Sequence, residues 1–494
     1  MLKRRNLFQE RYDSFLKELK NEILSGSLKP GEFILPENTL SEKYKISRVS
    51  VRKVLAQLVE EGLIEKIAGK GNRVKPPEEE IPRQTITLTW FSGSYETDIV
   101  RMIIDRYEKA HPYVRVELVI LPAEQYVHHV TQMMEEGKGP DLLFVSDAHM
   151  RDFVYLDKLH LIEPYTPKTL DPLQDSYPIL FDTFTPEDQL LAVPVHFSPV
   201  VICYNKEALE RAGVSEQDVN TMGSWDDLLR IAKQCTEEAR EDGVMEQYGF
   251  CFSSSTNRWP AFIMQNGGRF VSEGGRKGEF ADPRNWETLQ FCLDLMYKHH
   301  VSPIYSHGSS FLAETLFKKG RVAMIMSTYY FMNEFRGSDS HVLWDVAPLP
   351  GRTEQGTLLV CGALAINKHG DKTKVAESFV EFMIGSEAQS LLKRHGCTIP
   401  VRRTIAENDG LLDPVIHPAN YNAFKAMIPF TQSLQGLGIT AEQLYVLNTE
   451  LHELWANMET PESACKRVNV LLEQAYVQSK AAAKPTGQQT SVNG

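Results

Sequence analysis

Two arginines and a lysine lie close together on a short segment that the residue spacing predicts to be a helix. Valine and leucine recur at positions 51, 54, 55, 58 and 59, the spacing of an amphipathic helix with one buried face. The N-cap and first two turns of this helix hold the candidate contact residues Ser47, Arg48, Val49, Ser50, Arg52 and Lys53. Guanidinium groups match the acceptor geometry of phosphate and of guanine. This arrangement indicates nucleic-acid contact through the first turns of one helix.

The neighbouring segments predict the elements that would position this helix. Residues 40–46 are typical of the end of a supporting helix followed by a tight turn, and apolar residues between Tyr12 and Ile23 share one helical face. A turn made of Gly69, Lys70 and Gly71 follows and indicates a hairpin. Three helices and a hairpin predict a winged helix. The residues of its hairpin turn are also candidate DNA contacts. An ordinary hairpin loop is the alternative for that turn.

The charge distribution favours DNA contact over a simple solvated helix face. Residues 1–76 hold 16 Lys and Arg against 10 Asp and Glu, a net charge of +6, whereas the whole chain carries −12, which leaves −18 for the remainder. A basic unit attracts phosphates, and an acidic body repels DNA and confines contact to the basic unit.

Several ordered motifs give the first segment a family resemblance. They are residues 23–31, the stretch at 35–42 that begins Leu-Pro-Glu, the Ser-Arg-Val-Ser-Val-Arg stretch at 47–52 and the Gly-Lys-Gly turn at 69–71. The segment from about Tyr12 to Lys75 resembles the DNA-binding domain of the GntR family of bacterial transcription regulators. The resemblance implies that Arg48 and Arg52 contact an operator and that the glycine-flanked turn is a wing tip that approaches the minor groove.

Length and composition set the remaining expectations. A chain of 494 residues exceeds one domain, and roughly three units are expected at about 100 to 200 residues each. No apolar run approaches the length of a membrane helix, and the basic start lacks the apolar stretch of a secretory signal, so a cytoplasmic protein is expected. Seven scattered cysteines without a Cys-x-x-Cys pair argue against a disulfide framework and zinc, and buried reduced thiols are expected.

Composition also suggests the domain boundaries. We expect a DNA-binding domain at 1–76, a proline-rich acidic linker at 77–85, an effector domain at 86–478 and a disordered tail at 479–494. The start of the effector domain alternates strand and helix patterns, which predicts a parallel α/β sheet. Ligands of such sheets gather beyond the carboxyl ends of the strands, which here brings Ser92, Gly93 and Asp147 to one rim.

Seven motifs in order carry a second resemblance, over roughly residues 86–478. They include Gly-Pro-Asp at 139–141, Gly-Ser-Trp at 223–225, Gln-Asn-Gly-Gly at 265–268 and Ala-Pro-Leu-Pro-Gly at 347–351. The segment resembles the extracellular solute-binding proteins of family 1, the carbohydrate receptors of ABC importers. The resemblance implies a two-lobed periplasmic-binding-protein-like (type II) α/β domain, with crossovers near 194–204 and 344–361 and a cleft that closes on its ligand by hinge motion.

Carbohydrate recognition needs flat aromatic faces and a few fixed polar groups, so residues of both kinds near the expected cleft are candidates. Core packing is the alternative for each aromatic residue. The candidate ligand-binding residues are Ser92, Gly93, Asp147, His196, Phe197, Trp259, Tyr330 and Gly362.

Together these features predict a DNA-binding regulator whose operator affinity is controlled by a small molecule, with a mono- or oligosaccharide as the expected effector. Partners are a double-stranded operator and a second copy of the chain, because helix-turn-helix proteins usually read two half-sites. The adjacent histidine pairs at 128–129 and 299–300 lack a third ligand at a recognisable spacing, so no metal, cofactor or catalytic residue is predicted. The alternatives are a carbohydrate-binding protein with enzymatic activity and a transport-associated receptor.

Overall fold

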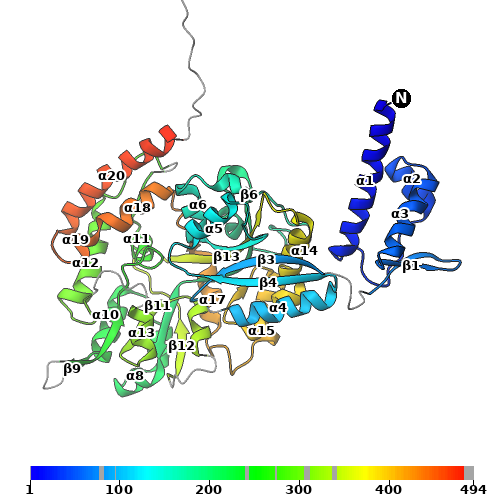
Figure 1. The fold of residues 1–494 in the computed structure, drawn as a ribbon. Coiled ribbons are helices and arrows are strands. Elements are labelled where there is room, and N and C mark those ends of the chain that lie inside the picture. Colours follow the sequence, from blue (N-terminus) through cyan, green and yellow to red (C-terminus); the bar gives the residue numbers. More distant parts are fainter. Residues whose placement is uncertain are drawn as a thin grey trace, which may run out of the picture.

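The computed structural model describes residues 2–76, 83–94, 96–239, 244–272, 275–304, 312–335 and 342–482. Its first unit is a winged helix, which lies to one side of the two larger sheets (Figure 1). The elements of this unit are α1 (Leu2–Leu24), α2 (Glu37–Tyr44), α3 (Arg48–Glu60), β1 (Ile64–Ile67) and β2 (Gly71–Val74). Strands β1 and β2 pair as an antiparallel hairpin, which confirms the predicted three helices and wing.

The core of the winged helix comes from the apolar stripes that the spacing predicts. Phe15, Leu19 and Ile23 of α1 are buried in one cluster with Val54 and Leu58 of α3. The expected stripe extended one residue too far, because Val59 at the edge of the helical face is 39% exposed.

The second unit begins with a six-strand path in the order β14-β7-β13-β5-β3-β4, which we call the larger sheet. Its strands are β3 (Gln84–Phe91), β4 (Val114–Leu121), β5 (Leu142–Ser146), β7 (Ala192–Pro199), β13 (Thr357–Asn367) and β14 (Ile399–Pro400). Strands β3, β4 and β5 are parallel, as the alternating pattern predicts. Strand β13 is antiparallel to both β5 and β7. The short strands β6 (Ile162–Glu163) and β15 (Thr431–Gln432) also pair with β13.

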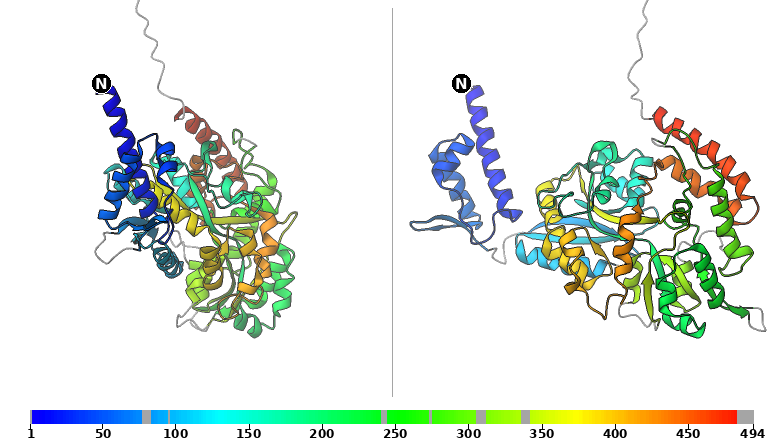
Figure 2. Two further views of the ribbon diagram at one scale, coloured as in Figure 1. Left: turned by 90° about the vertical axis from the view of Figure 1, so that its right-hand side faces the viewer. Right: turned by 180° about the vertical axis from the view of Figure 1, so that it is seen from behind.

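Helices surround the larger sheet and form one lobe with it (Figures 1 and 2). The parallel strands are connected by α4 (Thr97–Ala110) and α5 (Tyr126–Glu135), and α6 (Asp147–Tyr155) follows β5. Further along the chain come α7 (Pro178–Asp182), α14 (Thr373–Met383), α15 (Ser386–His395) and α16 (Arg403–Ala406). Helices α14 and α15 both contact α4, so a late part of the chain completes this lobe.

A five-stranded sheet in the order β12-β8-β11-β10-β9 forms the second lobe. Its strands are β8 (Val201–Asn205), β9 (Glu237–Ala239), β10 (Met245–Cys251), β11 (Val322–Ser327) and β12 (Trp344–Ala347). Its helices are α8 (Lys206–Arg211), α9 (Glu216–Asn220), α10 (Trp225–Cys235), α11 (Pro260–Gln265), α12 (Pro283–Tyr297) and α13 (Leu312–Lys318). The chain passes from the larger to the smaller sheet at Val200 and returns between β12 and β13.

The last helices connect the lobes. They are α17 (Asn422–Met427), α18 (Ala441–Glu450), α19 (His452–Trp455) and α20 (Pro461–Ala482). Helix α20 packs against α12 of the smaller-sheet lobe, and α18 contacts both α20 and α6 of the larger-sheet lobe. The expected tail at 479–494 began too early, because α20 continues through Ala482; residues 483–494 lie outside the described part of the chain.

All seven cysteines are buried free thiols, as expected. Burial raises the pKa of Cys251 and of Cys465 to about 12, so both remain protonated at neutral pH. Among the described helices, none combines the length and hydropathy that spanning a bilayer requires.

Candidate functional site

The exposed face of α3 carries most of the predicted DNA contacts. Arg48, Val49, Arg52 and Lys53 are exposed, and Val49 is 63% exposed although it is apolar. Ser47 is the N-cap: its Oγ accepts a hydrogen bond from the Ser50 backbone N–H at 3.2 Å. This cap makes the first turn of the helix begin at Arg48, and so fixes where the arginines project.

Ser50 lies inside the winged helix rather than on its contact face. Its side chain is 6% exposed, and its Oγ is 2.9 Å from Ser47 Oγ. Ser50, although it was predicted to contact DNA, is therefore buried against the N-cap of α3. Helical periodicity explains this, because positions 50, 54 and 58 are four residues apart and lie on the same, buried face of α3.

Glu37 orients one of the arginines, a contact that sequence reasoning missed. Arg52 Nε on α3 donates a hydrogen bond at 2.7 Å to Oε2 of Glu37, which lies in the first turn of α2. The pair is exposed, so it contributes little stability. It does hold the guanidinium by one edge and leaves its two terminal amino groups available to another acceptor.

The wing tip projects beyond the paired part of the β1–β2 hairpin. Gly69 and Gly71 have φ of +75° and +110°, a region that favours glycine, and a side chain at either position would meet nothing within 4 Å. Between them, Lys70 is exposed. The wing therefore presents one cation on a tight turn with open space around it.

In the two-lobed unit, the structure brings Asp147, His196, Tyr330 and Gly362 together where the lobes meet. Asp147 begins α6 directly after β5, and its carboxylate pairs with Arg151 at 3.0 Å. The other oxygen of Asp147 accepts a hydrogen bond from the Cys361 backbone N–H at 3.4 Å. Asp147 therefore anchors the middle of β13 to the start of α6.

Gly362 allows the closest packing in this region. It pairs with His196 across β13 and β7, where the strand register shifts. A methyl group at position 362 would lie 2.4 Å from the Phe144 ring and 2.8 Å from His196 Cε1. Only glycine therefore lets the Phe144 and His196 rings cover the β13 backbone.

His196 is the least satisfied polar side chain of this group. It is 1% exposed, and its ring centroid is 5.4 Å from that of Phe144 and 5.0 Å from that of Tyr330. Neither ring nitrogen has a hydrogen-bond partner among the described residues. Burial lowers the pKa of His196 to about 3, so the ring is neutral and offers one donor and one acceptor. Leaving such groups unpaired costs about 1–3 kcal/mol.

Tyr330 covers His196 from the other lobe. It lies in η3 (Tyr329–Phe335), directly after β11 of the smaller sheet, and is 8% exposed. Its hydroxyl donates a hydrogen bond to the Val360 backbone oxygen at 3.1 Å, in β13 of the larger sheet. Burial raises the pKa of Tyr330 well above its usual value. One side chain thus joins the two lobes over the unpaired histidine.

Glu96 is a second buried polar group in this region, and no sequence motif pointed to it. The Trp90 indole donates a hydrogen bond to Ser94 Oγ at 2.7 Å, and Ser94 donates to the Glu96 carboxylate. Glu96 is 3% exposed, and burial raises its pKa to about 7, although the Ser94 hydrogen bond opposes this. An acidic residue before a helix is ordinarily an exposed cap, so only its place in the rim loop could have drawn attention to it.

The remaining predicted ligand residues lie elsewhere. Phe197 is adjacent to His196 on β7 and so faces the opposite side of the sheet, where it packs against Tyr177 with ring centroids 5.1 Å apart. Ser92 and Gly93 are exposed at the end of β3, and Ser92 Oγ accepts a hydrogen bond from the Ala123 backbone N–H at 3.1 Å.

Trp259 belongs to an aromatic cluster of the smaller-sheet lobe rather than to the group around His196. It is 1% exposed and packs against Phe270, Phe280 and Trp455. The alternative reading of this aromatic as core therefore fits its position. The position of Trp259 in its motif could not distinguish an aromatic ring that lines a binding site from one that is packed in the core.

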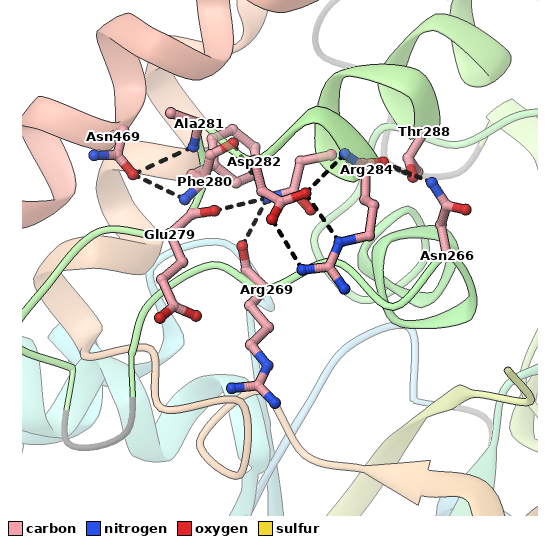
Figure 3. A network of polar contacts seen from close by, with 10 residues as sticks. Asn266, Arg269, Glu279, Phe280, Ala281, Asp282, Arg284, Thr288 and Asn469 are labelled. Carbon is pink, nitrogen blue, oxygen red and sulfur yellow. Dashed lines mark hydrogen bonds and ion pairs between the residues drawn. The ribbon is translucent and has the colours of Figure 1, made fainter. Parts of the chain in front are cut away.

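An open pocket of about 900 Å³ lies between the loop that precedes α12, the loop after β15 and helix α20. Figure 3 shows its polar network: Asp282 caps α12 and pairs with Arg284 at 2.9 Å, while Asn469 of α20 accepts a hydrogen bond from the Phe280 backbone N–H at 2.8 Å. None of the predicted ligand residues lines this pocket. These contacts hold α20 against the smaller-sheet lobe.

Two family models match separate parts of the chain. Residues 93–390 match the bacterial extracellular solute-binding protein family, and residues 11–74 match the gntR family of bacterial regulatory proteins. The arabinooligosaccharide-binding protein of Halalkalibacterium halodurans is 22% identical over 80% of this chain and 90% of that protein. The mannosyl-D-glycerate transport/metabolism system repressor of Escherichia coli is 29% identical over 26% of this chain and 48% of that protein.

Solved structures share the fold of the two-lobed unit. An ABC substrate-binding protein of Listeria monocytogenes in complex with cycloalternan has a TM-score of 0.68 and 20% identity, covering 80% of this chain and 99% of that one. A maltose-bound Thermotoga maritima protein has a TM-score of 0.65 and 20% identity, covering 79% and 99%. Because the family models match residues 93–390 and 11–74, the chain belongs to the bacterial extracellular solute-binding protein family, and its residues 11–74 form a DNA-binding domain of the gntR family.

Proposed function

We propose that this protein is a transcription regulator whose winged helix binds an operator and whose interlobe cleft binds a carbohydrate that changes operator affinity. The observation that carries the proposal is the joining, in one chain, of an exposed arginine face on a winged helix with a two-lobed solute-binding unit. We place the protein in the cytoplasm, where its operator would be, and propose that it acts as a homodimer on two half-sites.

On the DNA side, we propose that α3 enters the major groove and that the wing contacts the flanking backbone. Arg48 and Arg52 are the residues that we expect to read bases, because they project from the first two turns of α3. Val49, Lys53 and Lys70 would contact methyl groups or phosphates. Ser47 acts through its cap, and Gly69 and Gly71 act by shaping the wing.

On the effector side, we propose that carbohydrate hydroxyl groups pair with the two free nitrogens of His196. The ligand would replace Tyr330 over the imidazole, and the Tyr330 ring would then stack on the apolar face of the sugar. Asp147 and Gly362 position the surrounding backbone. A carbohydrate is favoured because similar proteins are named for arabinooligosaccharides, and similar structures hold cycloalternan or maltose.

Communication between the two sites follows from linkage. A ligand that binds the closed cleft more tightly than the open cleft shifts the population toward closure. Operator affinity then changes if the open and closed states bind the operator differently, and the operator changes ligand affinity by the same factor. Effector and operator therefore change each other's affinity reciprocally.

Gel shifts with promoter fragments from the protein's own locus test the DNA side. Arg48→Ala or Arg52→Ala should weaken binding by about 1–3 kcal/mol, roughly 5- to 160-fold. Arg101→Ala is the matched control, because Arg101 is an exposed arginine on α4 of the solute-binding unit. Equal losses for all three variants would refute a specific role for α3, and no binding of the parent protein at low salt would refute the proposed function.

Thermal shifts with a panel of arabino- and malto-oligosaccharides test the effector side. A ligand at 100 times its Kd stabilises the native state by about 2.7 kcal/mol. His196→Phe should abolish the shift, because a phenyl ring fills similar space without nitrogens. Phe197→Leu, on the opposite face of the same strand, should retain it. A full ligand shift in His196→Phe would remove this residue from the site.

A further inference from the structure

A tyrosine of the solute-binding unit completes the core of the winged helix. Tyr113 lies between α4 and β4, yet it is 1% exposed and belongs to the same buried cluster as Phe15, Leu58 and Val74. Its hydroxyl donates a hydrogen bond to the Lys75 backbone oxygen, directly after β2. The winged helix therefore lacks part of its core unless the other unit supplies this ring.

A histidine next to Tyr113 packs against the backbone at the end of α1. Gly26 has φ of +76°, and a methyl group at this position would lie 2.1 Å from His111 Cδ2. The imidazole is itself held in place, because it stacks on Tyr107 with centroids 4.1 Å apart and its Nδ1 lies 3.0 Å from the Tyr107 backbone oxygen. The contact between the two units is thus as close as packing within a core.

A third contact comes from a distant part of the chain. Ser378 of α14 donates a hydrogen bond from Oγ to the Ser25 backbone oxygen at 3.2 Å, and Ser25 is 1% exposed. The contacts from the α4–β4 connection and from α14 therefore all lie at the C-terminal ends of α1 and β2. Figure 1 and the right view of Figure 2 show the end of α1 next to this edge of the larger-sheet lobe.

We propose that these residues form a docking surface, consisting of Ser25, Gly26, His111, Tyr113 and Ser378, that fixes the winged helix to the larger-sheet lobe as one rigid body. The consequence for regulation rests on the proposed function. When a carbohydrate closes the cleft, the winged helix moves together with the larger-sheet lobe and relative to the smaller-sheet lobe. In a dimer held together through the smaller-sheet lobe, the angle between the lobes then sets the spacing of the two recognition helices.

Spin-label distance measurements on the full chain test the docking directly. Labels at Glu60→Cys on α3 and Arg101→Cys on α4 report on the two units, and both positions are exposed while the seven native thiols are buried. The docked arrangement predicts one narrow distance distribution, without DNA or ligand. Gly26→Ala should broaden it, because the added methyl group cannot fit against His111.

Gly31→Ala is the matched control for backbone strain. Gly31 also has a positive φ, of +92°, in the same domain, but a methyl group there would meet nothing within 4 Å. The control should keep the narrow distribution. Combining Gly26→Ala with His111→Gly should narrow the distribution again, because the second change removes the ring that clashes.

The docking proposal is overturned if the parent protein gives a broad distribution, or if Gly26→Ala is no broader than Gly31→Ala. It is also overturned if removing the His111 ring brings no recovery. Circular dichroism of each variant establishes that the winged helix remains folded. Because the experiment uses neither operator nor carbohydrate, its failure would leave the proposed function standing, and a failure of DNA binding would leave the docking result unchanged.

Discussion

Replacing Glu96 with glutamine should make the stability of the solute-binding unit less dependent on pH. Burial raises the pKa of Glu96 from 4.5 to about 7. Between these two values the folded protein keeps a proton that the unfolded chain has released, so the free energy of unfolding falls as the pH rises through this window. The difference corresponds to about 3 kcal/mol of lost stability above pH 7.

Glu96→Gln keeps the shape of the side chain but cannot ionise. The variant should match the parent near pH 4 and be more stable near pH 8 by up to about 3 kcal/mol. For a unit of this size, that stability gain corresponds to roughly 4 °C in Tm. Thermal unfolding of both proteins at closely spaced pH values between 4 and 8.5 measures the divergence.

Glu117→Gln is the matched control, since Glu117 is exposed on β4 and the change removes the same charge without involving a buried group. Its Tm curve should run parallel to that of the parent. Parallel curves for Glu96→Gln and the parent would contradict the reasoning, as would a Glu96→Gln protein that is less stable than the parent at pH 8. Either result would mean that the carboxylate is better solvated or better paired than its burial indicates.

Three further predictions concern packing, the wing and the thiols. Gly362→Ala should lower stability by about 1–3 kcal/mol, because its methyl group would lie against the Phe144 ring, and an unchanged Tm would contradict this. Lys70→Ala should reduce the slope of log affinity against log salt by about one in gel shifts, and an identical slope would exclude a phosphate contact. The native protein should react with a thiol reagent only slowly, whereas all seven thiols should react in denaturant; rapid labelling of the native protein would show that a cysteine is accessible.

Local patterns were sufficient to predict the winged helix and the parallel start of the larger sheet. The apolar spacing in residues 51–58 determined which side of α3 is buried, and with it the exposure of Arg48 and Arg52. Alternating segments predicted β3, β4 and β5 because strand and helix periods can be read from neighbouring residues. Prediction was least accurate at the ends of helices. The buried stripe of α3 stops before Val59, and α20 continues about one turn beyond the expected start of the tail, through residues 479–482.

The candidate site between the lobes was only partly predictable. Asp147, His196, Tyr330 and Gly362 meet where the lobes join, whereas Phe197 faces away and Trp259 lies in an aromatic core. Motif position indicates which loop or strand a residue occupies. It does not reveal which side of a strand faces the other lobe, because that depends on how two sheets pack.

The sequence by itself therefore determined the two kinds of unit, the exposed face of α3 and the family, because each depends on residues that are near one another in the chain. Only the tertiary structure decided that Glu96 and His196 are buried, that Tyr330 covers the histidine, and that Tyr113 completes the core of the winged helix. These contacts join residues from different units or from distant strands. Their energies come from exclusion of water and from close packing, which no local pattern of residues encodes.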